Sequence, residues 1–424
     1  MFVFVRKILK KYSEIPFVFK FSIAMIFFLR IILFVLPSFR IDMADWQAWA
    51  ARLADSGPFN FYSGNFFADY FPFFYLFLFV LVKIFILFFG KAAIFSIKFE
   101  IYIKTISNIF DILTAIVIFK IIDRHSKKWA FLGSTLYLLN PSGIFNSSIW
   151  GQIDAIPTFF LIFSLYQLEE KKNVIKSLFV SVLSFLIKPL NIAVLPFMSY
   201  RVIKNFSAKK IFKALGISLL LYFAVTVPFF LNDPILGPFK HLFGSLDIYP
   251  YTSINAYNFW ALFGWWKPDT TLLLNLSYHF WGFILYFIVL CVVFIPYFRE
   301  KIKIGTEFDY FACAISSTGF FLFLTRIHER HLFPAFSLII ISACIFRSRK
   351  LIFAYILMSI INFINLFYSY YYYNIALNNQ MASKNILFDI ASKYQIFFSV
   401  FSIAIFIAMI VVYFTEMKGN LDKF

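Results

Sequence analysis

Long apolar runs separated by short polar segments extend along almost the whole chain. Residues 17–36 are apolar on nearly every face of a helix, and similar runs recur as far as residue 414. A helix needs roughly 20 mostly apolar residues to cross a bilayer, whereas an outer-membrane strand alternates apolar and polar residues. The pattern therefore predicts an all-α fold: a polytopic integral membrane protein with a single membrane domain over residues 1–424.

Basic residues predict how the chain is oriented. Four of them precede the first apolar run: Arg6, Lys7, Lys10 and Lys11. Because Lys and Arg are retained on the cytoplasmic side, we expect the N-terminus inside and residues 38–70 outside, as a first outer loop. Within this loop, residues 46–53 form an amphipathic stretch that suits the membrane interface, where Trp46 and Trp49 would anchor it.

Following the apolar runs to the C-terminus predicts about 11–13 transmembrane helices. Residues 72–89 form one span, and we expect a separate short or re-entrant helix at 92–103 before the next span at 106–122. Further outer loops are expected at 231–271 and 368–395. These loops would share the outer face with residues 38–70.

The composition excludes a soluble protein and argues against a nucleic-acid-binding one. Hydrophobic residues make up 62% of the chain and charged residues 14%, far from the averages of soluble domains. The net charge of +18 comes from Lys and Arg clustered between apolar runs, where they set topology, so no nucleic-acid partner is expected. The three cysteines lie inside apolar runs without metal-ligand spacing.

Several polar groups fall on the outer side of this topology. They are Asp42, Asp69, residues 150–154, Lys188, residues 255–260 and residues 326–331. An ionisable group at membrane depth costs on the order of 2.5–3.5 kcal/mol, so such groups usually face a cavity and mark a site. We therefore expect them to share one outward-facing chamber.

These groups also have structural explanations. Asp42 and Asp45 suit the start of a helix, where a carboxylate favours the helix dipole, and Asp69 suits the start of the next one. Asp111 lies seven residues after Lys104, about two turns along one helix face, which favours an ion pair or hydrogen bond within the bundle. The 326–331 segment, in turn, could form a charge belt at the membrane interface.

The order of these residues resembles a known family. The matching motifs are Asp42-x3-Trp46-x2-Trp49, Gly57, Tyr62, Asp69-Tyr70-x-Pro72, Asn140-Pro141, Trp150-Gly151-Gln152-x-Asp154, Lys188-Pro189, Asn255-Ala256-Tyr257-Asn258-x-Trp260 and His328-Glu329-Arg330-His331. The ordered set is similar to the bacterial and archaeal GPI-mannosyltransferase-like proteins of the GT-C superfamily. Two positions depart from the family pattern: Phe71 replaces the first of two prolines, and His331 stands where Tyr is common.

The resemblance implies a polytopic glycosyltransferase. It would move a hexose, with mannose favoured, from a polyprenyl or dolichyl phosphate carrier to an acceptor at the outer face of the membrane. A carboxylate of the first outer loop would be the catalytic base, and by motif position that residue is Asp42. Single displacement would invert the anomeric configuration. A lipid-phosphate donor needs no nucleotide pocket, and a divalent metal is compatible with the reaction without being required.

The other polar residues divide by chemistry. Cationic and imidazole groups suit a phosphate, and we assign donor-phosphate and lipid-carrier binding to Arg330, Arg326, Lys188 and His328. Hydrogen-bonding and aromatic groups suit sugars, and we assign sugar or acceptor binding to Asp69, Tyr70, Trp150, Gln152, Asp154, Asn258, Trp260 and Glu329. None of these residues is assigned as a metal ligand.

Other functions stay open at this point. A transporter or a lipid-linked sugar flippase also uses acids, bases and broken helices along its pathway, and a membrane scaffold would not require Asp42 to meet the 326–331 segment. The expected partners are the polyprenyl-phosphate-linked sugar, membrane lipids and an acceptor that is a glycan, a lipid or a protein. The expected location is a prokaryotic cytoplasmic membrane, with the site facing outside. The separation of Asp42 from the 326–331 segment discriminates among these functions.

Overall fold

The computed structural model describes residues 16–59, 61–64, 66–298, 305–377 and 385–421, with side chains as far as Met417. The four basic residues at positions 6, 7, 10 and 11, which predict the orientation of the N-terminus, lie outside these ranges. Orientation must therefore be judged from basic residues farther along the chain.

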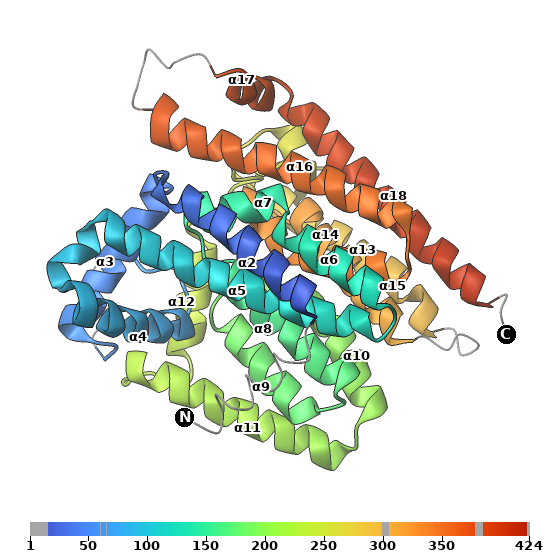
Figure 1. Cartoon of the computed structure of the whole chain (residues 1–424), viewed down its shortest axis with the longest axis horizontal. Helices are drawn as coiled ribbons and strands as arrows, with labels where there is room; N and C mark the ends of the chain where they lie inside the picture. Colours follow the sequence, from blue (N-terminus) through green and yellow to red (C-terminus); the bar gives the residue numbers. More distant parts are fainter. Residues whose placement is uncertain (1–15, 60, 65, 299–304, 378–384, 422–424) are drawn as a thin grey trace.

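Helices form almost all of the described chain (Figure 1). They are α2 (Phe17–Ile32), α3 (Arg40–Ser56), α4 (Pro72–Phe89), α5 (Ile97–Asp123), α6 (Lys127–Leu138), α7 (Pro141–Ile144), α8 (Ala155–Leu165), α9 (Val174–Phe185), α10 (Leu195–Asn205), α11 (Ala208–Thr226), α12 (Gly237–Leu246), α13 (Tyr278–Phe294), α14 (Thr306–Phe323), α15 (Phe333–Ile345), α16 (Arg349–Tyr371), α17 (Ile386–Lys393) and α18 (Gln395–Leu421). A short antiparallel pair, β1 (Leu272–Leu273) and β2 (Leu276–Ser277), precedes α13. The all-α prediction is confirmed.

Seven of the described helices are long and apolar enough to cross a membrane. They cover Phe17–Val35, Pro72–Phe89, Ile97–Asp123, Ala208–Phe229, Tyr278–Phe298, Arg349–Ala376 and Gln395–Met417. The chain is thus an integral, multi-pass membrane protein. The larger number predicted from hydropathy, about 11–13, includes shorter segments that proline or π-helical turns interrupt, such as the π-helical extension Tyr166–Glu170 of α8. That larger number stays a prediction.

One predicted boundary is wrong. Helix α5 is continuous, so residues 92–103 do not form a separate re-entrant helix. The predicted break falls at Lys104, whose Nζ donates hydrogen bonds to the carbonyls of Phe34 (3.1 Å) and Leu36 (2.6 Å). Because these carbonyls satisfy the buried cation from outside α5, the backbone of α5 stays helical through it.

The first outer loop is largely helical, because α3 fills its first half. Its indole rings do not anchor it at the membrane interface as predicted. Trp46 and Trp49 are 1% and 2% exposed and pack against Tyr70 and Phe74. The apolar face of the amphipathic stretch is therefore covered by the protein itself, which fixes Asp42 on the same helix in a rigid setting.

The two later outer loops also contain helices. Residues 231–271 include α12 and a 3-10 helix at Phe259–Phe263, and residues 368–395 include the last turn of α16, the π-helical segment Tyr372–Ala376 and α17. Figure 1 shows α16 and α18 lying side by side along one edge of the bundle, with α17 near the C-terminal end of α16 and the start of α18. Part of the second loop, residues 378–384, lies outside the described residues.

The centre of the bundle is formed by α14 and α15. Buried side chains occupy nearly every position of both helices. The segment that joins them carries residues 326–331, so this polar cluster sits at the end of the best-packed part of the protein. On α16, the Nδ2 atoms of Asn362 and Asn365 donate to the carbonyls of Glu329 (2.7 Å) and Asn255 (2.6 Å). One helix thus holds two site loops in place.

Candidate functional site

A cavity of about 520 Å³ lies among these segments and is lined by residues from Asp69 to His331. Its polar end is lined by Asp69, Tyr70, Lys188, His328, Arg330 and His331. The rest of its lining is mostly apolar, with Phe185, Leu190, Ile192, Leu242, Phe243, Leu246, Phe283, Phe320 and Leu324, and it also includes the polar Asp247, His279, Thr325 and Arg326. Several of the apolar residues, including Phe243 (63%) and Phe283 (51%), are largely exposed, so this part of the cavity opens onto the surface of the molecule.

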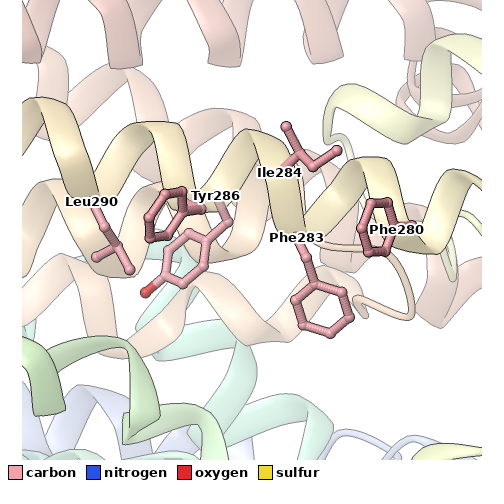
Figure 2. Close-up of a pocket in the computed structure, with 6 residues that line it drawn as sticks. Phe280, Phe283, Ile284, Tyr286 and Leu290 are labelled. Carbon is pink, nitrogen blue, oxygen red and sulfur yellow. The ribbon is translucent and has the colours of Figure 1, made fainter. Parts of the chain in front are cut away.

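A shallow apolar groove runs along α13 beside the open end (Figure 2). It is lined by Phe280, Phe283, Ile284, Tyr286, Phe287 and Leu290. Phe283 lines both this groove and the cavity. The apolar wall of the cavity therefore continues onto the outer face of α13.

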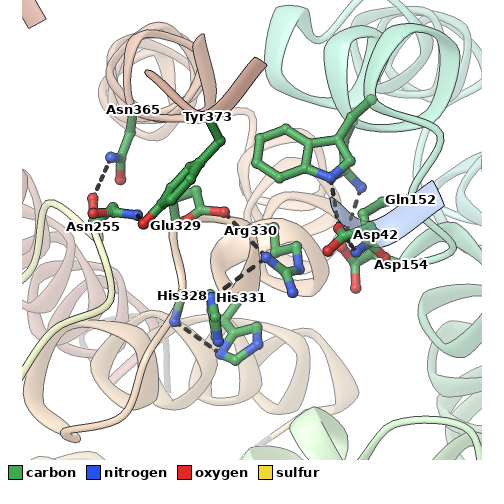
Figure 3. A network of polar contacts seen from close by, with 12 residues as sticks. Asp42, Gln152, Asp154, Asn255, His328, Glu329, Arg330, His331, Asn365 and Tyr373 are labelled. Carbon is green, nitrogen blue, oxygen red and sulfur yellow. Dashed lines mark hydrogen bonds and ion pairs between the residues drawn. The ribbon is translucent and has the colours of Figure 1, made fainter. Parts of the chain in front are cut away.

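Asp42 is not among the residues that line the cavity. It is held by the turn after a π-helical segment (Phe145–Trp150). Its Oδ2 accepts hydrogen bonds from Trp150 Nε1 (2.7 Å) and Gln152 Nε2 (2.5 Å) (Figure 3). Gly151 stands between these two donors with a φ of +85°, where a Cβ would lie 3.0 Å from Met43 Cε. Glycine lets the chain turn tightly enough for both side chains to reach one carboxylate.

The Oδ1 atom of Asp42 accepts no hydrogen bond from the part of the chain that the structure describes. One oxygen of this carboxylate is thus anchored and the other is free, the arrangement expected of an oriented base. The structural explanation also holds in part: Asp42 lies in the first turn of α3, where a carboxylate favours the helix dipole, although the capping residue is Phe39 and no side chain caps this end.

Arg330 joins Asp42 to the cavity. Its guanidinium lies 5.9 Å from the centre of the Trp150 ring, whose other neighbour is the stacked Phe39 ring at 4.1 Å. Its Nη1 donates to Glu329 Oε1 (3.2 Å). Although burial opposes it, the Asp42 and Glu329 carboxylates hold the pKa of Arg330 above its ordinary value. The first-loop aspartate and the arginine–histidine segment therefore meet at one site.

Lys188 reaches the same site from the end of α9. Its Nζ donates to Asp154 Oδ1 (2.5 Å) and lies 5.3 Å from the centre of the Tyr70 ring. Asn146 Nδ2 donates to the second oxygen of Asp154 at 3.2 Å. Asp154 is fully buried, so its charge is used to compensate Lys188.

Asp69 lines the cavity, and its Oδ1 is buried without a hydrogen-bond partner among the described residues. Burial and the nearby charge of Asp42 raise its pKa to about 6, against the opposing effect of Arg330 and Lys188. Burial and the charges of Asp69 and Asp42 likewise raise the pKa of Asp45 to about 6. Three carboxylates thus share one negative region, which the cations of the site only partly compensate.

Arg326 lines the cavity but is engaged elsewhere. Its Nε donates to Asp269 Oδ2 (2.7 Å) and its Nη1 to Asp247 Oδ1 (2.7 Å). Although burial opposes it, hydrogen bonds from His279 and Arg326 lower the pKa of Asp269 to about 2. The structure therefore places Arg326 in an ion-pair network at the rim, a less direct position for a phosphate than that of Arg330.

Several residues assigned to sugar binding are buried and make hydrogen bonds within the protein instead. Trp150 and Gln152 are 1% and 0% exposed; their N–H groups donate to Asp42, and Gln152 Oε1 accepts from the backbone N–H of Ile153 (3.1 Å) and the hydroxyl of Tyr70 (3.4 Å). Asn258 is buried, and its Oδ1 accepts from the backbone N–H groups of Trp260 and Ala261. Trp260 is fully buried, with its indole donating to the carbonyl of Phe323 at 2.6 Å.

These four residues do not line the cavity, because burial leaves no surface for a sugar. Glu329 is also buried and bonded to Arg330, and Asp154 to Lys188. Tyr70 and Asp69 do line the cavity. Of the residues assigned to the sugar or acceptor, only these two have that position.

The structure adds residues to which the sequence assigned no role. His331, expected in the chamber as part of the 326–331 segment, lines the cavity, and so does Tyr249, whose ring centre lies 5.2 Å from that of His328. Asn362 and Asn365 had no motif to mark them, although two asparagines three apart in an apolar helix signal a shared polar face. Among the described residues, no group of three or more His, Cys, Asp or Glu is arranged to hold a metal ion.

No family model matches the chain, and no curated protein matches it in sequence. The fold and the site together define the class: a multi-pass membrane protein with a cavity lined by Lys188, Arg330, two histidines and many apolar side chains, close to the Asp42 carboxylate.

Proposed function

We propose that this protein is a glycosyltransferase that moves a hexose from a polyprenyl or dolichyl phosphate carrier to an acceptor hydroxyl. The observation that carries the proposal is one cavity lined both by the cations Arg330 and Lys188 and by apolar side chains that reach the surface. A phosphate fits beside the cations, where Arg330 can offer its planar fork. An isoprenoid chain fits against the apolar side chains and their continuation along α13.

The position of Asp42 favours group transfer over binding alone. A carboxylate near the acceptor hydroxyl takes its proton while the acceptor oxygen bonds to the anomeric carbon of the sugar. The bond from that carbon to the phosphate oxygen breaks, and its electron pair leaves with the carrier phosphate. General-base catalysis of this kind contributes typically about 10²–10⁴-fold, and direct displacement inverts the anomeric centre.

The cations supply the second part of the mechanism. Negative charge grows on the phosphate oxygen as the bond breaks, and preorganised positive groups stabilise that charge in a water-poor site. Arg330 and Lys188 both line the cavity, with Arg330 the nearer to Asp42 through Trp150. Asp69 and Tyr70 remain as the residues that contact the sugar.

The motif order resembles GT-C enzymes, and this resemblance favours mannose as the sugar and a site on the outer face of a prokaryotic cytoplasmic membrane. A fold of about 11–13 spans belongs to the same proposal. The acceptor is an alcohol of a glycan, a lipid or a protein.

The test is turnover by the purified full-length protein. It is incubated with polyprenyl-phosphate hexoses labelled in the sugar and with membrane extract as the source of acceptor, and released polyprenyl phosphate is measured. We expect carrier release together with labelled product, and Asp42→Asn should lower the rate by about 100-fold or more, since an amide cannot take a proton.

Asp45→Asn is the matched control, because Asp45 lies on the same helix without contacting Trp150 or Gln152. It should keep the rate within a few-fold of wild type. Unchanged turnover in Asp42→Asn would remove Asp42 as the base. Movement of intact labelled carrier across vesicle membranes without bond cleavage would instead indicate a flippase.

A further inference from the structure

We propose that His331, together with His328, binds the carrier phosphate as a neutral imidazole that donates its Nε2–H. The inference rests on the proposed function and extends it to a residue that the motif analysis noted only as a departure. Both rings line the polar end of the cavity beside Arg330. Two neutral N–H donors there would recognise a phosphodiester monoanion through oriented hydrogen bonds, without adding positive charge to the site.

The ring of His331 is oriented by the backbone. Its Nδ1 accepts the backbone N–H of His328 at 3.3 Å, as part of a reciprocal cap at the start of the short helix Glu329–Leu332. A ring nitrogen that accepts a hydrogen bond carries no proton, so the proton of the neutral ring is on Nε2. Nε2 is the end of the ring that the cap leaves free.

The ring of His328 is oriented by Arg330. Nη1 of Arg330 lies 3.4 Å from His328 Nδ1, and a guanidinium nitrogen can only donate, so this Nδ1 also accepts. The two rings meet edge to face at 5.2 Å (Figure 3). Neither Nε2 makes a hydrogen bond with any residue in the described ranges.

The surroundings keep both rings neutral. Burial and the positive charges of Arg330 and Lys188 lower the pKa of His328 and His331 well below the ordinary value. Tyr249 faces His328 from the loop after α12. A second buried positive charge beside Arg330 would cost more free energy than a neutral hydrogen-bond donor. The imidazoles therefore add to phosphate binding through their neutral N–H groups.

The cations of the site already form ion pairs with carboxylates of the protein. The hydrogen bonds of the imidazoles therefore contribute more to phosphate binding. Lys188 is paired with Asp154, and Arg330 is paired with Glu329 and faces Asp42. A monoanion entering this site gains little net charge attraction. Two oriented N–H donors then decide whether a phosphate is preferred over an uncharged head group.

The test compares two probes with one lipid chain: methyl geranylgeranyl phosphate, a phosphodiester monoanion, and geranylgeraniol. Binding of each to the full-length protein in detergent is measured by calorimetry, and the affinity ratio is the phosphate selectivity. His331→Asn keeps an acceptor at the position of Nδ1 but lacks the Nε2 donor. We expect its selectivity to fall about 10-fold, while the affinity for geranylgeraniol stays within about twofold.

His331→Gln places an amide N–H near the position of Nε2 and should keep most of the selectivity, and His125→Asn, far from the cavity, should keep all of it. Full selectivity in His331→Asn would overturn the proposal, because His331 would then be only a cap. Wild type that binds both probes equally would instead refute the phosphate site and the proposed function with it.

A pH series tests the neutral state even if the variants fold poorly. It is run with the double variant Asp45→Asn with Asp69→Asn, because both carboxyls titrate near pH 6 in the same negative region. Selectivity should stay within about threefold between pH 8 and pH 5.5, where the diester charge is constant. A rise of about 10-fold on acidification would indicate an imidazolium and overturn the neutral-donor assignment.

Discussion

At the residue scale, Asp69 carries a charge that its surroundings disfavour. Burial and the Asp42 carboxylate raise its pKa from 3.8 to about 6. Between these two values the unfolded chain releases its proton first, so the folded state loses stability as the pH rises from about 4 to about 6, and the loss persists above pH 6. Such a cost is expected of a group kept for function, in keeping with the sugar contact proposed for Asp69.

Asp69→Asn should remove this loss, since an amide does not ionise. The variant should be more stable than wild type by up to about 3 kcal/mol at pH 8, from roughly 1.4 kcal/mol for each pKa unit, and the difference should vanish near pH 4. Thermal unfolding in detergent across this range measures it. Asp55→Asn, at an exposed position paired with Lys91, should show no such pH-dependent gain; an equal gain there would contradict the assignment to Asp69.

Residue types alone did not separate the groups that bind from the groups that position. Trp150, Gln152 and Asp154 have the chemistry of sugar binding, and the sequence correctly placed them near Asp42. Their burial decides otherwise, because their polar atoms are already hydrogen-bonded within the protein, to Asp42, Lys188 and neighbouring residues. Only the packing around a side chain shows which of its hydrogen bonds are left for a ligand.

At the element scale, a buried ion pair connects the first and third long helices of the bundle. Arg30 of α2 donates to Asp111 of α5 at 2.6 Å and to the carbonyl of Leu138 at 2.6 Å. The structural role predicted for Asp111 is confirmed, but its partner is Arg30 and not Lys104. Partners 81 residues apart cannot be deduced from spacing along one helix.

Arg30→Met should destabilise the protein by about 3–5 kcal/mol, because it leaves the Asp111 charge buried and unpaired. The double variant Arg30→Met with Asp111→Leu should recover most of this loss. Chemical denaturation in detergent measures both. Lys91→Met breaks an exposed pair with Asp55 and should cost less than about 1 kcal/mol. A double variant no better than Arg30→Met would show that packing, and not the unpaired charge, causes the loss.

At the scale of the whole molecule, charge divides the bundle into two ends. Helix α14 has 18 residues, which span about 27 Å, between Asp309 at its start and the site segment after its end. At the far end, Asp309 pairs with Arg201 (2.5 Å), Glu170 with Arg124, and Arg347 Nη2 donates to the carbonyl of His125. This basic end is the one expected in the cytoplasm.

The orientation can be tested with single cysteines in a background where the exposed Cys291 is replaced by Ser; Cys313 and Cys344 are buried. Lys240→Cys on α12, beside the cavity, should react with a membrane-impermeant maleimide in intact cells. Lys172→Cys at the basic end should react only after permeabilisation. The background variant should remain unlabelled, and the reverse pattern would place the site in the cytoplasm.

The sequence by itself determined that this protein lies in a lipid bilayer. It thereby also determined the all-α membrane fold, because runs of about 20 apolar residues leave few alternatives to helices in a bilayer. It also placed Asp42, Lys188 and Arg330 on one face. Only the tertiary structure decided which polar atoms remain available to a ligand. Among the described residues, Asp42 Oδ1 and the Nε2 atoms of His328 and His331 make no hydrogen bond, while the side chains of Gln152 and Asp154 are hydrogen-bonded within the protein. Hydropathy is a local property of the chain, whereas those contacts join segments separated by tens to hundreds of residues.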